Sequence, residues 1–287
     1  MKNEMTEKEL RRNGILLMLG ASICFSTGGL FIKLIPWNPL AINGARNLIA
    51  CLVILGYIRA TRHKIKVNPT VLVGAFSMAG VTTAYSIANK LTTAGNTIIL
   101  QYTAPIWIMV LTYLIFHRKP SRTGIISIAV VLAGILCFFF EGMSTGRWAG
   151  DLIALLSGVF YAGVFMLNSF EKGDALSSVF LGQLLCGIAL TPLAARETDF
   201  SFPVLLCVFL LGAVQVGLAY IFFTTGTKLM DPLTASIINA LEPILNPVLV
   251  AVFYGEKLGK MSLLGAAIVL CGILYYNLSE AVRGTQS

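Results

Sequence analysis

The chain has 287 residues, of which 56% are hydrophobic and only 12% are charged. A soluble domain carries roughly twice that charged fraction, so the composition excludes a soluble globular domain and predicts a multi-pass membrane protein. The formal net charge of +8 does not indicate nucleic acid, because the Lys and Arg residues cluster in alternate loops, as membrane topology requires. We therefore expect a lipid bilayer, and no nucleic acid, as a partner.

Ten apolar segments, separated by short loops, are long enough to cross a bilayer. The predicted spans are residues 13–35, 39–59, 70–90, 93–116, 121–140, 149–169, 176–196, 203–227, 232–254 and 261–279. Residues 1–12 and 280–287 form the two tails. Most Lys and Arg residues fall on the side of the tails, and this positive bias predicts that both termini are cytosolic.

An internal repeat relates the two halves of the chain. Lys90-Leu91 aligns with Lys228-Leu229, and Pro105-Ile106 aligns with Pro243-Ile244, at a constant spacing of 138 residues. The fourth and fifth spans therefore repeat as the ninth and tenth, and each unit has five spans, over residues 13–140 and 149–279. Because five is odd, the second unit is expected to be inverted in the membrane, which is the plan of many secondary transporters.

The ninth predicted span contains an acidic residue, Glu242. Asp231 can cap the start of this span and Pro232 suits its first helical position. Glu242 then falls near the middle of the bilayer, where an ionisable group is costly and by default suggests function. Pro243 and Pro247 are expected to break or kink the helix there. Glu242 could bind a substrate ammonium, take up a proton that couples transport, or serve as a structural acid paired with a neighbour.

The chain resembles the drug/metabolite transporter superfamily of the EamA type. The residues that carry the resemblance are 21–26 (ASICFS), 45–48 (ARNL), 241–243 (LEP), 253–257 (FYGEK) and the glycines at 265 and 272. The resemblance implies a ten-helix transporter whose central cavity is lined by spans 1, 3, 4, 6, 8 and 9. It also implies alternating access by rocking of helix hairpins, often with export of metabolites or amino acids.

Amides and aromatic residues in the apolar spans are the other candidates for substrate binding. Gln101 and Asn239 occupy equivalent positions in the two units, and such amides either line a cavity or join helices by hydrogen bonds. Aromatic rings can enclose a protonated or quaternary amine, although each ring alone can also be packing or an interfacial anchor. Besides Glu242, the predicted substrate-binding residues are Gln101, Asn239, Trp107, Tyr102, Tyr85, Phe25, Tyr161, Asn246 and Asn96.

Arg46 is a base inside the second span. Its planar donor fork could bind a substrate carboxylate, its long side chain could instead snorkel to the lipid headgroups, or it could pair with Glu242.

The sequence offers no catalytic or metal-binding motif. The six cysteines are scattered through apolar spans without a CxxC or Cys/His spacing, so we expect neither a metal nor a disulfide framework. No Walker A, HExxH or GxSxG motif occurs, and no cofactor is expected. An intramembrane enzyme would need a second catalytic group near Glu242, whereas His63 and His117 fall at the inner rim. A structural subunit would not need a midplane acid.

The sequence thus predicts a secondary transporter of small polar metabolites in the plasma (inner) membrane, and not an enzyme. We expect it to move amino acids or related amines, outward, as a monomer or homodimer. The alternative is a carrier of organic cations such as choline-like or guanidinium-like compounds. Either carrier could be proton-coupled or facilitative.

Overall fold

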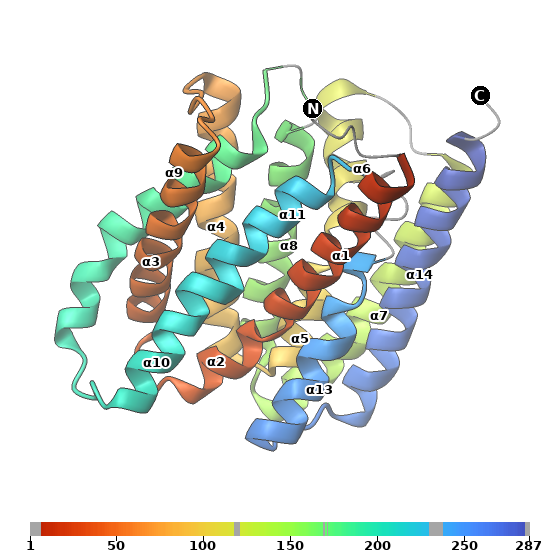
Figure 1. The fold of residues 1–287 in the computed structure, drawn as a ribbon. Helices are drawn as coiled ribbons and strands as arrows, with labels where there is room; N and C mark the ends of the chain where they lie inside the picture. Colours follow the sequence, from red (N-terminus) through yellow and green to blue (C-terminus); the bar gives the residue numbers. More distant parts are fainter. Residues whose placement is uncertain (1–6, 118–120, 169, 171, 230–237, 285–287) are drawn as a thin grey trace.

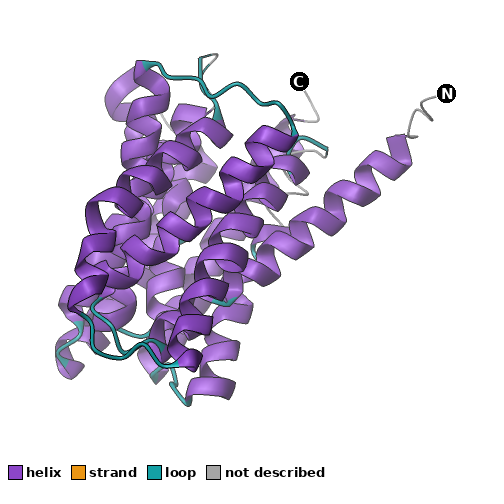
Figure 2. Cartoon of the chain, turned by 60° about the vertical axis from the view of Figure 1, so that its left-hand side comes forward, coloured by secondary structure: helices purple, strands orange, loops and turns teal. Residues whose placement is uncertain are grey.

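The structure of the chain, a computed structural model, describes residues 7–117, 121–168, 170, 172–229 and 238–284. Within these residues the chain is helical, with no β-strand, and loops gather at the two ends of a helix bundle (Figures 1 and 2). The prediction of an all-α protein is thus confirmed. Asp231 and Pro232, the expected start of the ninth span, lie outside the described residues.

The helices follow the order of the predicted spans, and several spans consist of two helices. Their bounds are α1 (Glu7–Ser26), α2 (Gly28–Leu34), α3 (Pro39–Ala60), α4 (Pro69–Leu91), α5 (Ala94–Gln101), α6 (Ala104–Phe116), α7 (Arg122–Thr145), α8 (Trp148–Asn168), α9 (Ala175–Leu190), the 3₁₀-helix η1 (Thr191–Arg196), α10 (Phe202–Leu210), the π-helix η2 (Leu211–Leu218), α11 (Ala219–Gly226), α13 (Glu242–Tyr254) and α14 (Lys260–Gly284).

Seven helical stretches are long and apolar enough to cross a membrane by length and composition. They are Arg12–Leu34, Pro39–Ala60, Pro69–Leu91, Ala94–Phe116, Arg122–Thr145, Ala175–Arg196 and Phe202–Gly226. Three shorter apolar helices, Trp148–Val164, Glu242–Tyr254 and Lys260–Tyr276, fall where the sequence predicts the remaining spans. The total of ten spans and the cytosolic placement of the termini stay predictions.

The internal repeat of the sequence is also a repeat of helix boundaries. Helices α6 and α13 each have 13 residues, and each carries a proline, Pro105 or Pro243, next to its first residue. Proline is tolerated there because the first turn of a helix does not use its N–H groups. Both helices end in a left-handed residue, His117 with φ 53° and Gly255 with φ 78°. The two units therefore break their fourth and ninth spans at equivalent places.

Glycines allow close helix packing at both edges of the bundle. In Figure 1, α7 and α14 lie side by side at one edge, and a Cβ added at Gly265 would lie 2.8 Å from the carbonyl oxygen of Gly134. At the opposite edge α3 packs on α9, where a Cβ at Gly44 would lie 2.3 Å from the backbone carbon of Leu190. A side chain at either position would push the helices apart.

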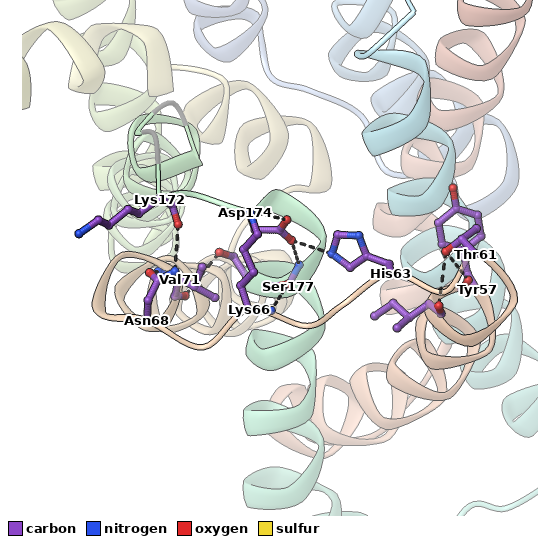
Figure 3. Close-up of polar contacts among 11 residues, drawn as sticks. Tyr57, Thr61, His63, Lys66, Asn68, Val71, Lys172, Asp174 and Ser177 are labelled. Carbon is purple, nitrogen blue, oxygen red and sulfur yellow. Dashed lines mark hydrogen bonds and ion pairs between the residues drawn. The ribbon is translucent and has the colours of Figure 1, made fainter.

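The two ends of the bundle are each joined by polar contacts. At the lower end in Figure 1, which we call the Glu256 end, Lys33 of α2 pairs with Glu256 after α13 at 2.7 Å. At the upper end, the Asp174 end, the α3–α4 connection meets the start of α9. Figure 3 shows His63 and Lys66 facing Asp174, with His63 Nε2 3.1 Å from an oxygen of Asp174.

Candidate functional site

A cavity lies where helices of both units meet in the middle of the bundle. It is lined by Phe25, Arg46, Val81, Thr82, Tyr85, Gln101, Tyr161, Gln215, Val216, Tyr220 and Glu242. These residues come from α1, α3, α4, α5, α8, η2, α11 and α13. The wall therefore includes α3, which is the second span, as well as the spans that the family resemblance implies.

Arg46 is the buried cation of the cavity, with a side chain 2% exposed. Its Nε and Nη2 donate to Oδ1 of Asn43 at 3.2 and 3.1 Å, and Nη2 also donates to the Thr82 carbonyl at 2.9 Å. Nη1 has no hydrogen-bond partner within the part of the chain that the structure describes. A guanidinium held in this way does not reach lipid headgroups, so the snorkelling interpretation does not fit the structure.

Glu242 is the buried anion of the cavity, 6% exposed, and it is the first residue of α13. Its Oε2 accepts a hydrogen bond from the Tyr102 hydroxyl at 2.7 Å. Nδ2 of Asn239 donates to the same hydroxyl at 2.9 Å. The other carboxylate oxygen, Oε1, has no hydrogen-bond partner among the described residues. At the helix break, one carboxylate oxygen of Glu242 thus accepts a hydrogen bond from a tyrosine. The second oxygen can accept a hydrogen bond from a ligand in the cavity.

The two charges line one cavity without pairing with each other. The ion pairs among the described residues are Lys33–Glu256, His63–Asp174 and Lys66–Asp174. Burying a charge without a partner is costly, and the cost falls when a ligand of opposite charge enters. The arrangement can therefore bind a small molecule that carries both an anionic and a cationic group.

Aromatic rings form much of the remaining wall. The Phe25 and Tyr220 rings meet edge to face, with centroids 5.0 Å apart. The Arg46 guanidinium carbon lies 6.0 Å from the centroid of the Tyr85 ring, which is within the range of a cation–π contact. Tyr161 of α8 completes this side of the cavity. Such a wall suits an amine or a small apolar side chain.

Local structure explains where Gln215 and Arg46 lie. Gln215 belongs to η2, a π-helical stretch inside the otherwise α-helical eighth span, and such stretches often occur at functional sites. A Cβ at Gly212 of η2 would lie 2.7 Å from the Arg46 carbonyl, and one at Gly28 would lie 2.8 Å from Nε2 of Gln215. The glycines let α2 and α3 approach η2 closely enough to bring both side chains to one cavity.

The structure brings only some of the predicted site residues to this cavity. Phe25, Arg46, Tyr85, Gln101, Tyr161 and Glu242 line it. Tyr102 and Asn239 do not line the cavity: Tyr102 donates a hydrogen bond to Glu242, and Asn239 donates one to Tyr102. Asn246 donates to the Tyr85 hydroxyl at 3.2 Å and Trp107 donates to Thr103 at 3.1 Å. Asn96 lies apart and donates to Asp151 at 3.0 Å.

Five further residues line the cavity: Val81, Thr82, Gln215, Val216 and Tyr220. Of these, the sequence already indicates the aromatic Tyr220 and the amide Gln215 as residues of helices expected to line the cavity, whereas the other three were not predicted. Gln215 carried a usable signal, because an amide in an apolar span is unusual, as it is for Gln101. The valines and Thr82 give no such signal, since they are ordinary residues of a buried helix. Among the described residues, no group of three or more His, Cys, Asp or Glu side chains gathers into a metal-binding cluster.

Comparison with known proteins agrees with this architecture. The model of the EamA-like transporter family matches residues 12–140 and again residues 148–278. The chain belongs to the EamA-like transporter family. The family domain is thus present twice, and the resemblance within the drug/metabolite transporter superfamily that the sequence suggested is confirmed.

Relatives of this EamA-like transporter extend over nearly its whole length. An uncharacterized transporter of Bacillus subtilis (strain 168), YwfM, is 28% identical over 274 residues, covering 90% of this chain and 92% of that one. An uncharacterized transporter of Archaeoglobus fulgidus is 23% identical over 275 residues, covering 92% and 96%. A solved crystal structure shares the fold with a TM-score of 0.61 at 20% identity, covering 93% of this chain and 98% of that chain.

Proposed function

We propose that this EamA-like transporter moves small zwitterionic metabolites, amino acids or related amines, by alternating access between its two units. The observation that carries the proposal is the pair of unpaired buried charges, Arg46 and Glu242, on the wall of one cavity. A family member that buried these charges for stability alone would pair them, because a buried charge without a partner destabilises the fold.

The geometry supports one orientation of the ligand. Nη1 of Arg46 would donate to the ligand carboxylate, and Oε1 of Glu242 would accept from its ammonium, both as charge-assisted hydrogen bonds. The amides of Gln101 and Gln215 supply further donors and acceptors on the same wall. The rings of Phe25 and Tyr220 would contact the side chain of the ligand.

Direction, membrane and coupling are part of the proposal. The positive bias of the loops on the side of the two termini supports cytosolic ends, in the plasma (inner) membrane, and export is the direction that the family resemblance implies. Glu242 would exchange its ligand for a proton, which couples transport to the proton gradient. The protein would act as a monomer or a homodimer.

A carrier of organic cations is the second candidate. The tyrosines and Phe25 around Glu242 favour it, because aromatic rings bind quaternary and protonated amines. Such a carrier would not use Arg46 as a ligand-binding group, and a cationic ligand would be repelled by its charge. The role of Arg46 therefore separates the two candidates.

The test is a thermal-shift measurement on purified protein with three ligand sets: amino acids, amines without a carboxylate, and carboxylates without an amine. A ligand at about 100 times its Kd stabilises the folded state by ~2.7 kcal/mol. We expect amino acids to stabilise the wild type and neither Glu242→Gln nor Arg46→Met. Asp174→Asn, a carboxyl-to-amide change outside the cavity, is the control and should keep the ligand response.

Each other outcome decides against part of the proposal. If amines stabilise the wild type and Arg46→Met equally, the protein is an organic-cation carrier. If Glu242→Gln retains the full response to amino acids, Glu242 does not bind the ligand. If carboxylates alone stabilise the protein, the ligand is an anion and the zwitterion proposal is wrong.

A further inference from the structure

A second acid, Asp151, is buried away from the cavity at the Glu256 end. It lies in the first turn of α8, is 0% exposed, and does not line the cavity. Oδ1 accepts from Oγ1 of Thr92 at 2.7 Å and from Nδ2 of Asn96 at 3.0 Å. Oδ2 is buried and has no hydrogen-bond partner within the described residues. One oxygen of this carboxyl group thus accepts two hydrogen bonds, and the other accepts none from the described residues.

No cation neutralises this carboxyl in the described part of the chain, since none of its ion pairs includes Asp151. The charged groups near it are the exposed Arg147, between α7 and α8, and the half-buried Glu141 of α7. Beyond Thr92 lie the charged groups Lys33, Lys90 and Glu256, and Glu197 lies near Lys90. An isolated carboxylate in such a place is costly, and binding of a cation or a proton removes the cost.

The space beside Oδ2 favours a proton over a metal ion. A Cβ added at Gly142 of α7 would lie 2.3 Å from Oδ2, so the backbone of α7 already packs against this oxygen. A hard cation needs several oxygen ligands around it, and the glycine backbone occupies that room. A proton needs no such space. Residues 145–148 are exposed and lie within two helical turns of Asp151, so water at the Glu256 end is close to this carboxyl group.

Thr92 connects this carboxyl to the ion pair that closes the Glu256 end. Its hydroxyl donates to Asp151, while its carbonyl accepts from Nζ of Lys33 at 2.8 Å. Lys33 pairs with Oε2 of Glu256 at 2.7 Å, and Oε1 of Glu256 accepts from the backbone N–H of Ala94 at 2.6 Å. Residues 92–94 therefore form hydrogen bonds with α2, with α8 and with the end of α13. Since α2 belongs to the first unit and α8 and α13 to the second, these hydrogen bonds connect the two units.

We propose that Asp151 is a proton-binding site, distinct from the cavity, whose protonation loosens the closure of the Glu256 end through Thr92. A proton from the water at that end binds Oδ2 and leaves a neutral carboxyl group, with no other reactant. Hydrogen bonds to a charged acceptor are roughly twice as strong as those between neutral groups, so protonation weakens the hold on Thr92 and Asn96. The turn that anchors Lys33 and Glu256 then opens more readily.

The protonation itself is measured by infrared difference spectroscopy of the purified protein between neutral and mildly acidic pH. A protonated carboxyl has a C=O band that a carboxylate lacks. We expect a band that is lost in Asp151→Asn and kept in Glu141→Gln, which removes the acid near Asp151, and in Glu242→Gln, which removes the acid of the cavity. A spectrum of Asp151→Asn that retains every band of the parent would overturn the proposal.

The link to closure is measured with a reporter cysteine at Ala94, which is fully buried beside the ion pair. The six native cysteines are first replaced, and reaction with a membrane-impermeant thiol reagent is compared with that of a second reporter at Met143, 71% exposed. The ratio of the two rates removes the intrinsic pH dependence of thiol chemistry. We expect this ratio to rise severalfold on acidification of the parent, and to be high at every pH in Asp151→Asn.

Thr92→Val separates the site from the connection, and it keeps the proposal testable should Asp151→Asn fail to fold. It should retain the infrared band of Asp151 but lose the pH dependence of the labelling ratio. A ratio that stays pH-dependent in Asp151→Asn or in Thr92→Val contradicts the proposal, and so does a ratio that follows Na⁺ at constant pH. Neither measurement uses a transported ligand, so their outcome is independent of the proposed function.

Discussion

The two charges of the cavity are held in different ways. Arg46 lies within the unbroken helix α3, and hydrogen bonds to Asn43 and Thr82 fix two of its three nitrogens. Glu242 begins a helix at a break and accepts a single hydrogen bond, from Tyr102. Broken helices in transporters form substrate and ion sites near the middle of the bilayer, from the ends of their half-helices. We infer that the cation belongs to a fixed wall and the anion to an element that moves.

The two units also differ at the break itself. Ala104, the first residue of α6, occupies the place in the first unit that Glu242 occupies in the second. The first break therefore contributes an uncharged wall, with Gln101 just before it, and the second contributes the charge. A symmetric architecture thus carries an asymmetric site, because one unit supplies Arg46 and the other supplies Glu242.

The largest expected effect comes from disturbing the fixed wall. In Gly44→Ala the new methyl group would meet the backbone of Leu190 and Thr191 at 2.3 Å, so α3 must move away from α9. We expect a loss of stability of about 3 kcal/mol, or no folded protein. Gly56→Ala in the same helix meets nothing within 4 Å and should gain up to ~1 kcal/mol from helix propensity. Melting curves of the two purified variants that coincide would show that this wall is not rigid.

A more selective change loosens the cation without removing it. Asn43→Ala takes away the acceptor of two Arg46 nitrogens and leaves the Thr82 carbonyl. Since a hydrogen bond to a charged group contributes about 1.5–3 kcal/mol, affinity for amino acids should fall roughly 10- to 100-fold. Titration calorimetry with an amino acid and with the matching amine measures this. An equal loss for both ligands would mean that Asn43 shapes the whole cavity and not the guanidinium alone.

A smaller effect is expected at the anion. Tyr102→Phe removes the hydroxyl that donates to Glu242, and we expect affinity for amino acids to fall by roughly tenfold or less. The loss is smaller than in Asn43→Ala because a carboxylate at a helix break can turn towards the ligand. Tyr113→Phe, an exposed tyrosine of α6, is the matched control and should bind as the wild type does. A larger loss in Tyr102→Phe than in Asn43→Ala would reverse the assignment of fixed and mobile sides.

From the sequence, physical arguments predicted the all-helical fold, the repeat of the family domain and Glu242 as a candidate site residue. The 138-residue repeat includes prolines and glycines, which set helix boundaries. The structure accordingly shows α6 and α13 beginning and ending at equivalent positions of the repeat. Glu242 is identified by depth alone, because an acid at the middle of a span is costly wherever it points. These signals depend on position along the chain, which the sequence contains.

The rest of the site depends on which face of each helix meets its neighbours. Trp107 and Asn246 were predicted to bind substrate, as Gln101 was. In the structure Trp107 donates a hydrogen bond to Thr103 and Asn246 donates one to Tyr85, and neither lines the cavity. Arg46 left three interpretations open because nothing in the sequence showed that Asn43 and Thr82 would hold it inward. The π-helical turn that places Gln215 is likewise a property of packing, and helix periodicity does not predict it.

The smallest effect is expected at the Asp174 end, where an acid lies outside the spans. Burial raises the pKa of Asp174, but the hydrogen bonds from Ser177 and the charge of His63 outweigh it and hold this pKa below its ordinary value. A carboxyl with a depressed pKa in the folded state stabilises the protein above its unfolded pKa, and the stabilisation is lost as the pH falls through the folded value. Asp174→Asn should therefore lower the melting temperature near neutral pH and not in acid.

The size of this effect distinguishes a partly exposed ion pair from the buried charges of the cavity. Exposed pairs contribute about 0–1 kcal/mol and are screened by salt, so the difference between wild type and Asp174→Asn should shrink in high salt. Asp199→Asn is the control, because Asp199 caps Ser201 through a backbone hydrogen bond and forms no ion pair within the described residues. Melting temperatures across pH and salt measure both. A difference that persists in acid would show that Asp174 acts through its shape as a helix cap, which Asn preserves only in part, and not through its charge.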